Sequence, residues 1–281
     1  MAAARAVAET APEAEILVVD NASGDGIAQD LARLVPSARL LREISNRGYG
    51  AGCNRGARES SRAHLLFLNS DAVVRPGAVA HLAAALEADP GAAAAGPRLT
   101  HPDGSLQESI RRLPTPWRIF CESSGLAFLS GGREPFSGHA ATRQDHTAAR
   151  RVEALMGAAL LVRRSAFEEV EGFDESFFLY AEETDLMARW RARGWGILYA
   201  PEAEVTHVGG RSGGDRLFGQ LHASLVRYTQ KHHGIPAARL AAVTLDGGAA
   251  LRYAVAMLTP GEKGRAWRAR YRAALSRPGA R

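Results

Sequence analysis

Three carboxylates stand close together at the predicted start of a helix. Glu182, Glu183 and Asp185 open the helix that we expect over 181–193. Glu182 and Asp185 are spaced i, i+3 and share one face, whereas Glu183 points about 100° around the axis. Mutual repulsion raises the pKa of at least one carboxylate, which can produce a proton acceptor suited to neutral pH. The alternative is a helix N-terminus whose acids favour the helix dipole, with Asp185 paired to Arg189 at i+4.

Polar residues follow two strong strand patterns. Asp20 ends the apolar run 16–19, and Asn69 and Asp71 follow the apolar run 65–68. An acid at a strand end suits Mg²⁺ or Mn²⁺ between diphosphate oxygens, because hard cations prefer oxygen ligands. Asp20 also suits recognition of a ribose or a base. Both acids fit ordinary turns as well, an Asp-Asn turn at Asp20 and a helix-capping turn at Asp71, and these alternatives stay open.

His207 and a glycine-rich segment are weaker signals. His207 ends the predicted strand 205–207 and precedes Gly209-Gly210, so it suits a metal or phosphate ligand, although a lone histidine also fits a structural role. The glycines of 48–52 resemble a dinucleotide fingerprint, but such a fingerprint follows the first strand of a sheet and this segment does not. Hydride transfer is therefore disfavoured. The sequence also lacks a P-loop, a zinc-spaced Cys/His set and a nucleophile elbow.

The elements that position these residues alternate along the chain. Near-continuous apolar runs alternate with helical patterns, which indicates an α/β fold with a mostly parallel central sheet covered by helices on both faces. Ligands of such sheets bind at the carboxyl ends of the strands. The predicted strands are 15–20, 40–41, 65–68, 92–99, 155–162, 197–199 and 205–207. The predicted helices are 2–9, 27–35, 54–62, 76–86, 181–193 and a short helix capped by Ser165 and Glu168.

Two regions depart from this alternation. Residues 101–150 are rich in Gly, Pro, Ser, Arg and His, which predicts a long, partly mobile loop that closes over a ligand. From Leu217 onward the pattern is helical, with breaks expected at 234–236 and 246–248.

The net charge of +5 is concentrated at one end of the 281-residue chain. Residues 261–281 carry seven basic side chains against one acidic side chain, a net of +6, so residues 1–260 sum to −1. A nearly neutral body argues against a nucleic-acid platform, which needs a basic stripe on the folded domain. Two cysteines exclude a disulfide scaffold. No uninterrupted apolar run reaches the roughly 18 residues that a membrane-crossing helix needs, so none is expected.

Four motifs in order resemble the family-2 glycosyltransferases, which have a GT-A fold. The motifs are Val18–Gly26, Asn46–Gly56, Leu68–Asp71 and Phe173–Leu186. The run 200–203 and His207 with Gly209, Gly210 and Ser212 complete the pattern. The resemblance covers about residues 5–233 and is greatest to the bacterial rhamnosyltransferase-like branch.

The resemblance implies a role for each matching residue. Residues of the nucleotide pocket would be Asp20, Asn21, Asn46, Gly50, Asn54 and Asn69, the last standing at the first acid of the family's DXD motif. Asp71 would stand at the second acid of that motif and bind the metal, and His207 would contact the metal or the diphosphate. Glu183 would be the general base, while Glu182 and Asp185 would support it or contact the acceptor sugar.

The resemblance also implies an activity and its partners. The expected protein is an inverting glycosyltransferase that uses Mg²⁺ or Mn²⁺ and a nucleotide-diphosphate sugar, with L-rhamnose from dTDP-rhamnose favoured. Its acceptor would be a hydroxyl of a cell-surface glycan or a lipid-linked glycan. We expect a transferase domain over 1–214, a helical extension over 215–281, and a cytoplasmic location. The basic tail, with Trp267 and Tyr271, would rest on the inner face of the membrane or be a frayed terminus.

One departure from the family pattern bears on donor binding. Family members open with a strand and loop before the position of Val18, whereas residues 1–14 here have a helical pattern. We therefore expect a sheet with an open edge or an altered central strand. The alternative function is an N-terminally truncated, inactive remnant of the fold that serves as a binding or partner module. Nucleic-acid binding through the arginine-rich tail is a further alternative, and no nucleic acid is expected as a partner.

Overall fold

The computed structural model describes residues 1–24, 26–140, 143–209 and 216–276. The predicted motif positions Asp25, Gly210 and Ser212 and the tail residues Arg277 and Arg281 lie outside these ranges. The chain divides into two compact units. Unit 1 comprises 1–110, 145–178 and 182–209, and unit 2 comprises 111–144, 179–181 and 210–281. The expected domain boundary at residue 214 stays a prediction.

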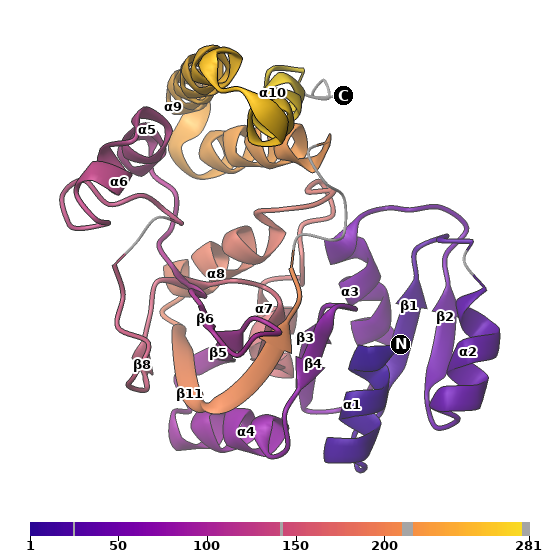
Figure 1. Ribbon diagram of the computed structural model, residues 1–281. Coiled ribbons are helices and arrows are strands. Elements are labelled where there is room, and N and C mark those ends of the chain that lie inside the picture. Colours follow the sequence, from indigo (N-terminus) through magenta and orange to yellow (C-terminus); the bar gives the residue numbers. More distant parts are fainter. Residues whose placement is uncertain (25, 141–142, 210–215, 277–281) are drawn as a thin grey trace. The chain divides into compact units, whose positions relative to one another are not determined.

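A mixed sheet of seven described strands forms the centre of unit 1, in the order β3-β10-β5-β11-β4, with β6 on β5 and β8 on β11 (Figure 1). The strands are β3 (His64–Leu68), β4 (Ala72–Val74), β5 (Ala92–Thr100), β6 (Leu106–Gln107), β8 (Arg150–Arg151), β10 (Ala159–Arg163) and β11 (Gly196–His207). Within this sheet only β5 and β11 run parallel. The expectation of a mostly parallel sheet is therefore wrong. An apolar run indicates that a strand is buried on both faces, as β5 is. It does not indicate whether the strand runs parallel or antiparallel to its neighbours.

A separate parallel pair stands beside this sheet. β1 (Leu17–Asp20) pairs with β2 (Arg39–Arg42), and α2 (Ile27–Leu34) connects them. All four residues of β1 are only half-buried, although the apolar run predicts a fully buried strand. Among the described residues, β1 pairs only with β2 and β3 pairs only with β10. The sheet is thus interrupted between β1 and β3, in keeping with the altered sheet that the sequence predicts.

Most helices of unit 1 pack on the seven-stranded sheet, whereas α3 (Tyr49–Glu59) packs on β1. The helices on the sheet are α1 (Ala2–Thr10), α4 (Ala78–Ala88), α7 (Arg164–Glu169) and α8 (Glu182–Ala192). α1 packs on β4 and α4 packs on β5 and β11, which buries Val7, Leu82 and Leu99 in one apolar core. The predicted helices over 2–9 and 181–193 are confirmed.

Two helix predictions in unit 1 need correction. α3 begins at Tyr49, not at Asn54, so most of the glycine-rich segment is helical rather than a loop. α7 begins at Arg164 with Arg163 as its N-cap and no capping side chain, so the capping box of Ser165 and Glu168 is wrong.

Two strand predictions also change. The expected strand 155–162 is split into β9 (Ala154–Leu155), which pairs with β7 (Ile110–Arg111), and β10, with a turn between them. The expected strands 197–199 and 205–207 are one strand, β11, which continues through Pro201 because its pairing with β5 shifts register between Ala200 and Glu204. A register shift of this kind accommodates a residue that cannot donate to the ladder.

Unit 2 is helical, with α5 (Pro116–Ser124), α6 (Leu126–Leu129), α9 (Arg216–Leu258) and α10 (Gly261–Leu275). The expectation of a loop over 101–150 is therefore wrong where α5 and α6 lie. The Pro and Gly residues near α5 mark the ends of this helix rather than a loop. Thr115 caps its start by accepting a hydrogen bond from Arg118 N at 3.2 Å, and Pro116 is the first helical residue. Gly125, with φ 88°, ends the helix.

α9 contains one of the two breaks that the sequence predicts. Gly234 leaves helical geometry, with φ 85° and ψ 171°, immediately before Pro236. The expected break at 246–248 is wrong, because the helix continues there. A Cβ on Gly248 would lie 2.7 Å from Ser123 O, so this glycine allows α9 to approach α5 rather than ending the helix.

One described helix segment, Leu217–Leu258, is long enough to cross a membrane and contains an 18-residue stretch with a mean hydropathy of 1.2, which is apolar enough to do so. The expectation of no membrane-crossing helix rested on uninterrupted apolar runs, and charged residues such as Arg239 and Asp246 interrupt this segment. Core helices of soluble proteins have the same properties, so length and composition alone assign it no location.

Candidate functional site

Asp71 and His207 face each other where β4 pairs with β11. Asp71 Oδ1 lies 3.3 Å from His207 Nε2, and Val208 N donates to the Asp71 carbonyl at 3.1 Å. The other ring nitrogen, His207 Nδ1, is 2.8 Å from Gln107 Oε1 on β6. Gln107 therefore orients the imidazole so that Nε2 points toward the carboxylate. The structure brings the two predicted metal ligands together.

Three segments that are distant in sequence meet at the turn between β9 and β10. Asn69 N donates to the carbonyl of Ala158 at 2.9 Å, which holds the 69–71 segment on this turn. Gly157 lies against Glu183, because a Cβ on this glycine would be only 3.0 Å from Glu183 Cγ. Tyr49 OH, at the start of α3, lies 3.5 Å from the Gly157 carbonyl. The predicted metal-binding segment and the predicted general base thus contact the same turn.

The carboxylates at the start of α8 occupy different environments. Glu182 is 4% exposed, and its Oε2 has no hydrogen-bond partner among the described residues. Burial, followed by the charge of Glu183, raises the pKa of Glu182 well above its ordinary value. Glu183 is half-buried. Asp185 is fully buried and its Oδ2 accepts from Arg189 Nε at 2.8 Å, so the predicted i+4 ion pair is confirmed.

The backbone immediately before these carboxylates is strained. Tyr180 and Ala181 both have left-handed φ values, 67° and 63°. Each such non-glycine residue costs of order 1–3 kcal/mol, and strain of this kind clusters at functional sites.

Asp20 and Asn21 shape the loop that leaves β1. Asp20 Oδ1 accepts from Ser23 N at 2.8 Å and from Ser23 Oγ at 2.6 Å, and these bonds lower the pKa of Asp20. Asn21 Nδ2 donates to the Gly48 carbonyl at 3.0 Å. Asn21 Oδ1 is buried and has no hydrogen-bond partner among the described residues. The turn expected at Asp20 is present, and the nucleotide-binding roles of both residues stay predictions.

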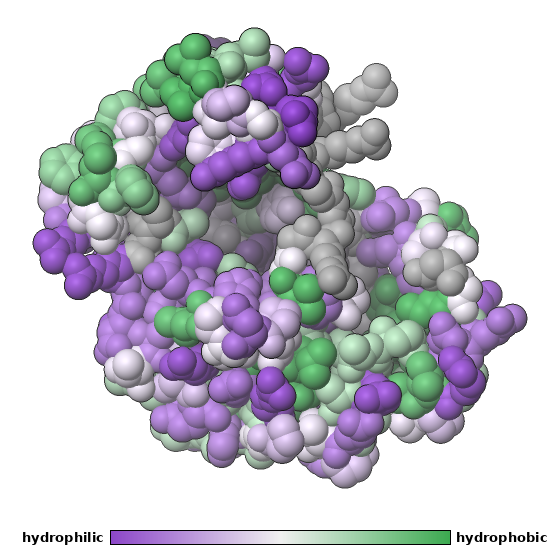
Figure 2. Space-filling model, in the orientation of Figure 1, coloured by the Kyte–Doolittle hydropathy of each residue, from purple (hydrophilic) through white to green (hydrophobic). Residues whose placement is uncertain are grey.

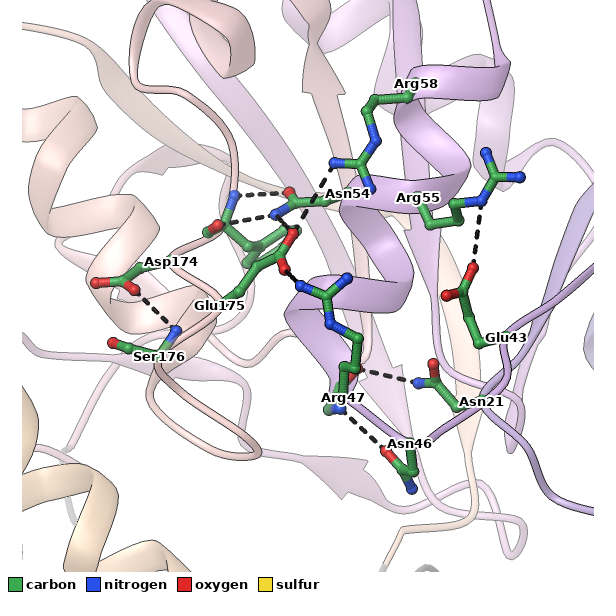
Figure 3. Close-up of polar contacts among 12 residues, drawn as sticks. Asn21, Glu43, Asn46, Arg47, Asn54, Arg55, Arg58, Asp174, Glu175 and Ser176 are labelled. Atoms are coloured by element: carbon green, nitrogen blue, oxygen red, sulfur yellow. Dashed lines mark hydrogen bonds and ion pairs between the residues drawn. The ribbon is translucent and has the colours of Figure 1, made fainter. Parts of the chain in front are cut away.

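Asn54 and Asn46 hold the glycine-rich segment in place (Figure 3). Asn54 is buried and clamps Phe173, because its Nδ2 donates to Phe173 O at 2.9 Å and its Oδ1 accepts from Phe173 N at 2.9 Å. Asn46 Oδ1 accepts from Gly48 N at 2.9 Å. Gly50 lies close to Phe173, since a Cβ at Gly50 would be 3.0 Å from Phe173 Cβ. The structure thus shows positioning contacts for these three residues, and their roles in a nucleotide pocket stay predictions.

Glu175 joins this cluster from the segment that follows Phe173. It accepts from Asn54 Nδ2 at 3.0 Å and forms ion pairs with Arg47 and Arg58 (Figure 3). These contacts fasten the segment before α8 to α3, so they connect the position of Glu183 to the glycine-rich helix.

Comparison with known proteins decides the family. The sequence matches the model of "Glycosyl transferase family 2" over residues 2–170, which is more than half of the chain. This chain belongs to glycosyl transferase family 2. The glycosyltransferase is 34% identical over 257 residues to the N-acetylglucosaminyl-diphospho-decaprenol L-rhamnosyltransferase of Mycobacterium tuberculosis, covering 84% of this chain and 81% of the relative.

Solved structures are similar in fold. The glycosyltransferase aligns with the mannosyltransferase PcManGT of Pyrobaculum calidifontis, solved with GDP-Man and Mn²⁺, with a TM-score of 0.53 and 16% identity, covering 93% and 76% of the two chains. It also aligns with GalNAc-T7, solved with UDP, GalNAc and Mn²⁺, with a TM-score of 0.57 and 14% identity. That match covers 95% of this chain, which spans 50% of that structure. These likenesses support the GT-A fold.

The Asp71–His207 pair fits a divalent cation as a partial donor set. A carboxylate oxygen and an imidazole nitrogen are donors that such cations accept, and at 3.3 Å both can face one ion. In the described ranges, no group of three or more His, Cys, Asp or Glu side chains is placed to hold a metal. The other coordination positions would therefore be left to diphosphate oxygens or water, as is usual for Mg²⁺.

The sequence interpretation missed two parts of this site. Gln107 orients His207, but it lies on a strand of only two residues in a region predicted to be a loop. The sequence pattern of so short a strand does not indicate which residues it pairs with. Gly157 provides the space beside Glu183, and its importance depends on a contact between positions 26 residues apart. The nearby Cys53 is not a reactive thiolate, because burial raises its pKa to about 12.

Proposed function

We propose that this glycosyltransferase moves L-rhamnose from dTDP-rhamnose to a hydroxyl of a lipid-linked glycan, with inversion at the anomeric carbon. The observation that carries the mechanism is the turn between β9 and β10, which contacts both Glu183 and the segment containing Asp71. The sugar and the lipid-linked acceptor are supported by the similarity to the M. tuberculosis rhamnosyltransferase, whose name specifies L-rhamnose and N-acetylglucosaminyl-diphospho-decaprenol.

Glu183 acts as the general base. It takes the proton of the acceptor hydroxyl, whose oxygen then bonds to the anomeric carbon on the face opposite the leaving group. The bond from that carbon to the diphosphate breaks, and the nucleoside diphosphate leaves with the electron pair. Burial and the charge of Glu183 raise the pKa of Glu182, which favours a single negative charge shared by the two neighbouring acids.

Asp71 and His207 hold the donor side of the site. They would bind Mg²⁺ or Mn²⁺ through Asp71 Oδ1 and His207 Nε2, with the imidazole fixed by Gln107. When bound, such a cation neutralises charge that develops on the diphosphate. The chain of contacts from Asn21 to Gly48 and from Gly48 to Phe178 places the predicted nucleotide-binding loop beside α3.

The test is product formation by the purified full chain. The protein is incubated with Mn²⁺, a polyprenyl-diphosphate-linked N-acetylglucosamine in detergent, and dTDP-rhamnose, UDP-glucose or GDP-mannose. Mass spectrometry should detect a deoxyhexose addition only with dTDP-rhamnose, and NMR should show an anomeric configuration opposite to that of the donor. Retained configuration would contradict the base role of Glu183, and transfer from another donor would contradict the choice of sugar.

The inactive remnant is the second candidate, favoured by the interruption between β1 and β3. It predicts no product with any donor. It also predicts no change in the thermal midpoint when UDP, dTDP or GDP is added with Mn²⁺. A dTDP-specific increase in the midpoint would contradict it even where the acceptor is unsuitable.

A further inference from the structure

The second half of α9 presents an uncharged outer face to solvent. Its large exposed side chains include Val243 at 72%, Leu251 at 60% and Leu258 at 87% exposure. Between Leu240 and Leu258, no residue on this exposed face is charged. At a rise of about 1.5 Å per residue the face is roughly 28 Å long. A continuous apolar strip of this length on a surface marks an interaction site.

The opposite face of α9 is already used for packing. Ala241 and Leu245 are buried against Ile119 of α5. Arg252 fastens the two helices by donating to Ser123 O and to Glu122 O, the latter at 2.8 Å. α9 is therefore apolar on both sides, and a helix of that kind is normally buried on both sides. Within the described residues no other element covers this outer face, so we expect an apolar partner to contact it.

α6 and α5 extend the exposed apolar surface. Phe128 and Leu129 of α6 are 87% and 79% exposed, which is exceptional for side chains of this size. The rings of Trp117, Phe120 and Phe136 form an exposed cluster, with centroids of Trp117 and Phe120 5.5 Å apart. Figure 2 shows hydrophobic side chains over the end of α9 and over α5 and α6.

α10 lines α9 with positive charge. Its exposed basic side chains include Lys263, Arg265, Arg270 and Arg272, and Glu262 is its one acidic residue. α10 packs closely on α9, and Arg268 Nη1 donates to the carbonyl of Ala256 at 2.7 Å. Lys263 lies over the half-exposed ring of Trp267, 5.3 Å from its centroid. Hydrophilic residues over α10 adjoin the hydrophobic ones in Figure 2.

We propose that unit 2 docks on the surface of an anionic lipid bilayer. The outer face of α9 and the tip of α6 enter the boundary between headgroups and acyl chains, and the basic side chains of α10 meet lipid phosphates. An exposed apolar strip beside basic residues and tryptophan is the pattern of an interfacial helix. α9 lies in the plane of the membrane rather than crossing it, because its inner face carries Arg252 and packs on α5.

A second copy of the chain is a poorer occupant of this surface. A two-fold dimer through α9 would bring two α10 helices to the same interface, where their like charges repel. An anionic membrane instead complements both the apolar strip and its basic margin. The proposal rests on this surface and does not depend on which sugar the enzyme transfers.

Co-sedimentation with vesicles tests the proposal. The full chain is mixed with vesicles of phosphatidylcholine alone, or of phosphatidylcholine and phosphatidylglycerol in equal parts. We expect binding to the anionic vesicles that weakens as salt is raised. The variant Val243→Glu, Leu251→Glu, Leu258→Glu should bind at least tenfold more weakly. The matched control Leu34→Glu, at an exposed leucine of α2 in unit 1, should bind like wild type.

A second variant separates charge from apolar contact and guards against misfolding. Lys263→Gln, Arg265→Gln removes two exposed basic side chains of α10 and should lower affinity for anionic vesicles roughly tenfold or more. Circular dichroism checks the fold of each variant, and Val243→Glu alone replaces the triple variant if that one unfolds. Wild-type protein that stays in the supernatant with both vesicle types would overturn the proposal. So would a dimer, seen by light scattering, that the Val243→Glu change abolishes.

Discussion

Glu182 is a carboxyl group held without a hydrogen-bond partner for one oxygen in a nearly closed environment. Its 4% exposure and the adjacent Glu183 charge both favour the protonated form. The raised pKa of Glu182 reduces the repulsion between the two acids at the start of α8. It also has a measurable consequence for stability.

We predict that Glu182→Gln stabilises the protein increasingly as pH rises. The folded-state pKa of Glu182 is raised, so at low pH both states hold the proton and the substitution changes little. As pH rises through the ordinary carboxyl range, the unfolded state loses its proton more readily than the folded state, so ionisation of Glu182 lowers stability. Glutamine cannot ionise and removes this loss. The thermal midpoint of the variant should exceed that of wild type more at pH 8 than at pH 4.

The exposed acid Glu13 supplies the control for this measurement, because Glu13→Gln removes a carboxylate at a solvent-facing position. A difference between Glu182→Gln and wild type that is independent of pH would contradict a raised pKa for Glu182.

Gln107 gives a second test at the scale of one side chain. Gln107→Ala removes the group that orients His207, and such supporting contacts typically change metal affinity or activity by about 10–100-fold. The Mn²⁺ concentration that gives half-maximal turnover should rise by this factor. Gln29→Ala, at an exposed position of α2, should leave it unchanged. If Gln107→Ala needs the same Mn²⁺ concentration as wild type for half-maximal turnover, the proposed role of His207 as a metal ligand would be contradicted.

At the scale of elements, the start of α3 depends on a close approach between two backbones. Gly48 has φ 96°, and a Cβ there would lie 2.1 Å from the carbonyl oxygen of Phe178. Tyr49 N donates to the same oxygen at 3.0 Å. This contact joins the glycine-rich helix to the segment that leads to the α8 carboxylates.

We predict that Gly48→Ala destabilises the protein more than Gly104→Ala does. Both glycines have positive φ, 96° and 82°, so both substitutions strain the backbone, but a Cβ on Gly104 meets nothing within 4 Å. Backbone strain should lower the free energy of unfolding by about 1 kcal/mol or more in both variants. At Gly48 the clash of the new Cβ with Phe178 should lower it by about 1–3 kcal/mol more. Urea denaturation should resolve this difference. An equal decrease in the free energy of unfolding of the two variants would contradict the prediction, because it would mean that the contact with Phe178 does not oppose a Cβ at position 48.

The sequence predicts elements better than it predicts how they pair. The apolar runs of β3 and β5 were identifiable because strands buried on both faces have few polar residues. The antiparallel pairing of β10 with both strands depends on contacts between positions far apart in sequence, which no local pattern reports. The same limit applies to Gly248, whose role in helix packing looks like a helix break when only its neighbours in sequence are considered.

The site shows a similar division. Asp71, His207 and Glu183 could be proposed from the sequence because the ordered motifs of the family include them, and the structure places them at a strand start, a strand end and a helix start, while their roles stay predictions. Asp185 was equally conspicuous in sequence, and its full burial against Arg189 gives it a structural contact that the motif does not reveal. Which carboxylate faces the β9–β10 turn follows from tertiary contacts with Gly157.

At the scale of the whole molecule, the predicted site and the proposed membrane surface belong to different units. Unit 1 contains all of the predicted site residues, and unit 2 contains both the apolar strip of α9 and the basic α10. Lipid-linked acceptors stay in the membrane because their chains are insoluble in water. An enzyme that acts on them gains from a surface that keeps it at the bilayer.

We predict that the α9 variant Val243→Glu, Leu251→Glu, Leu258→Glu separates two activities. It should transfer sugar normally to a short-chain, water-soluble analogue of the acceptor, since the unit 1 site is unchanged. Transfer to a long-chain acceptor embedded in anionic vesicles should fall at least tenfold, in proportion to lost binding. Equal loss with both acceptors would indicate that unit 2 affects catalysis directly, contrary to the docking role.

The most direct test of the central claim is the turnover of Glu183→Gln, measured as nucleoside diphosphate release that depends on acceptor. The account predicts a rate lower by about 10²–10⁴-fold, because the base is lost while shape and donor binding are retained. The thermal shift caused by dTDP with Mn²⁺ should stay as in wild type. Turnover in Glu183→Gln within a few fold of wild type would contradict the assignment of Glu183 as the base of this glycosyltransferase.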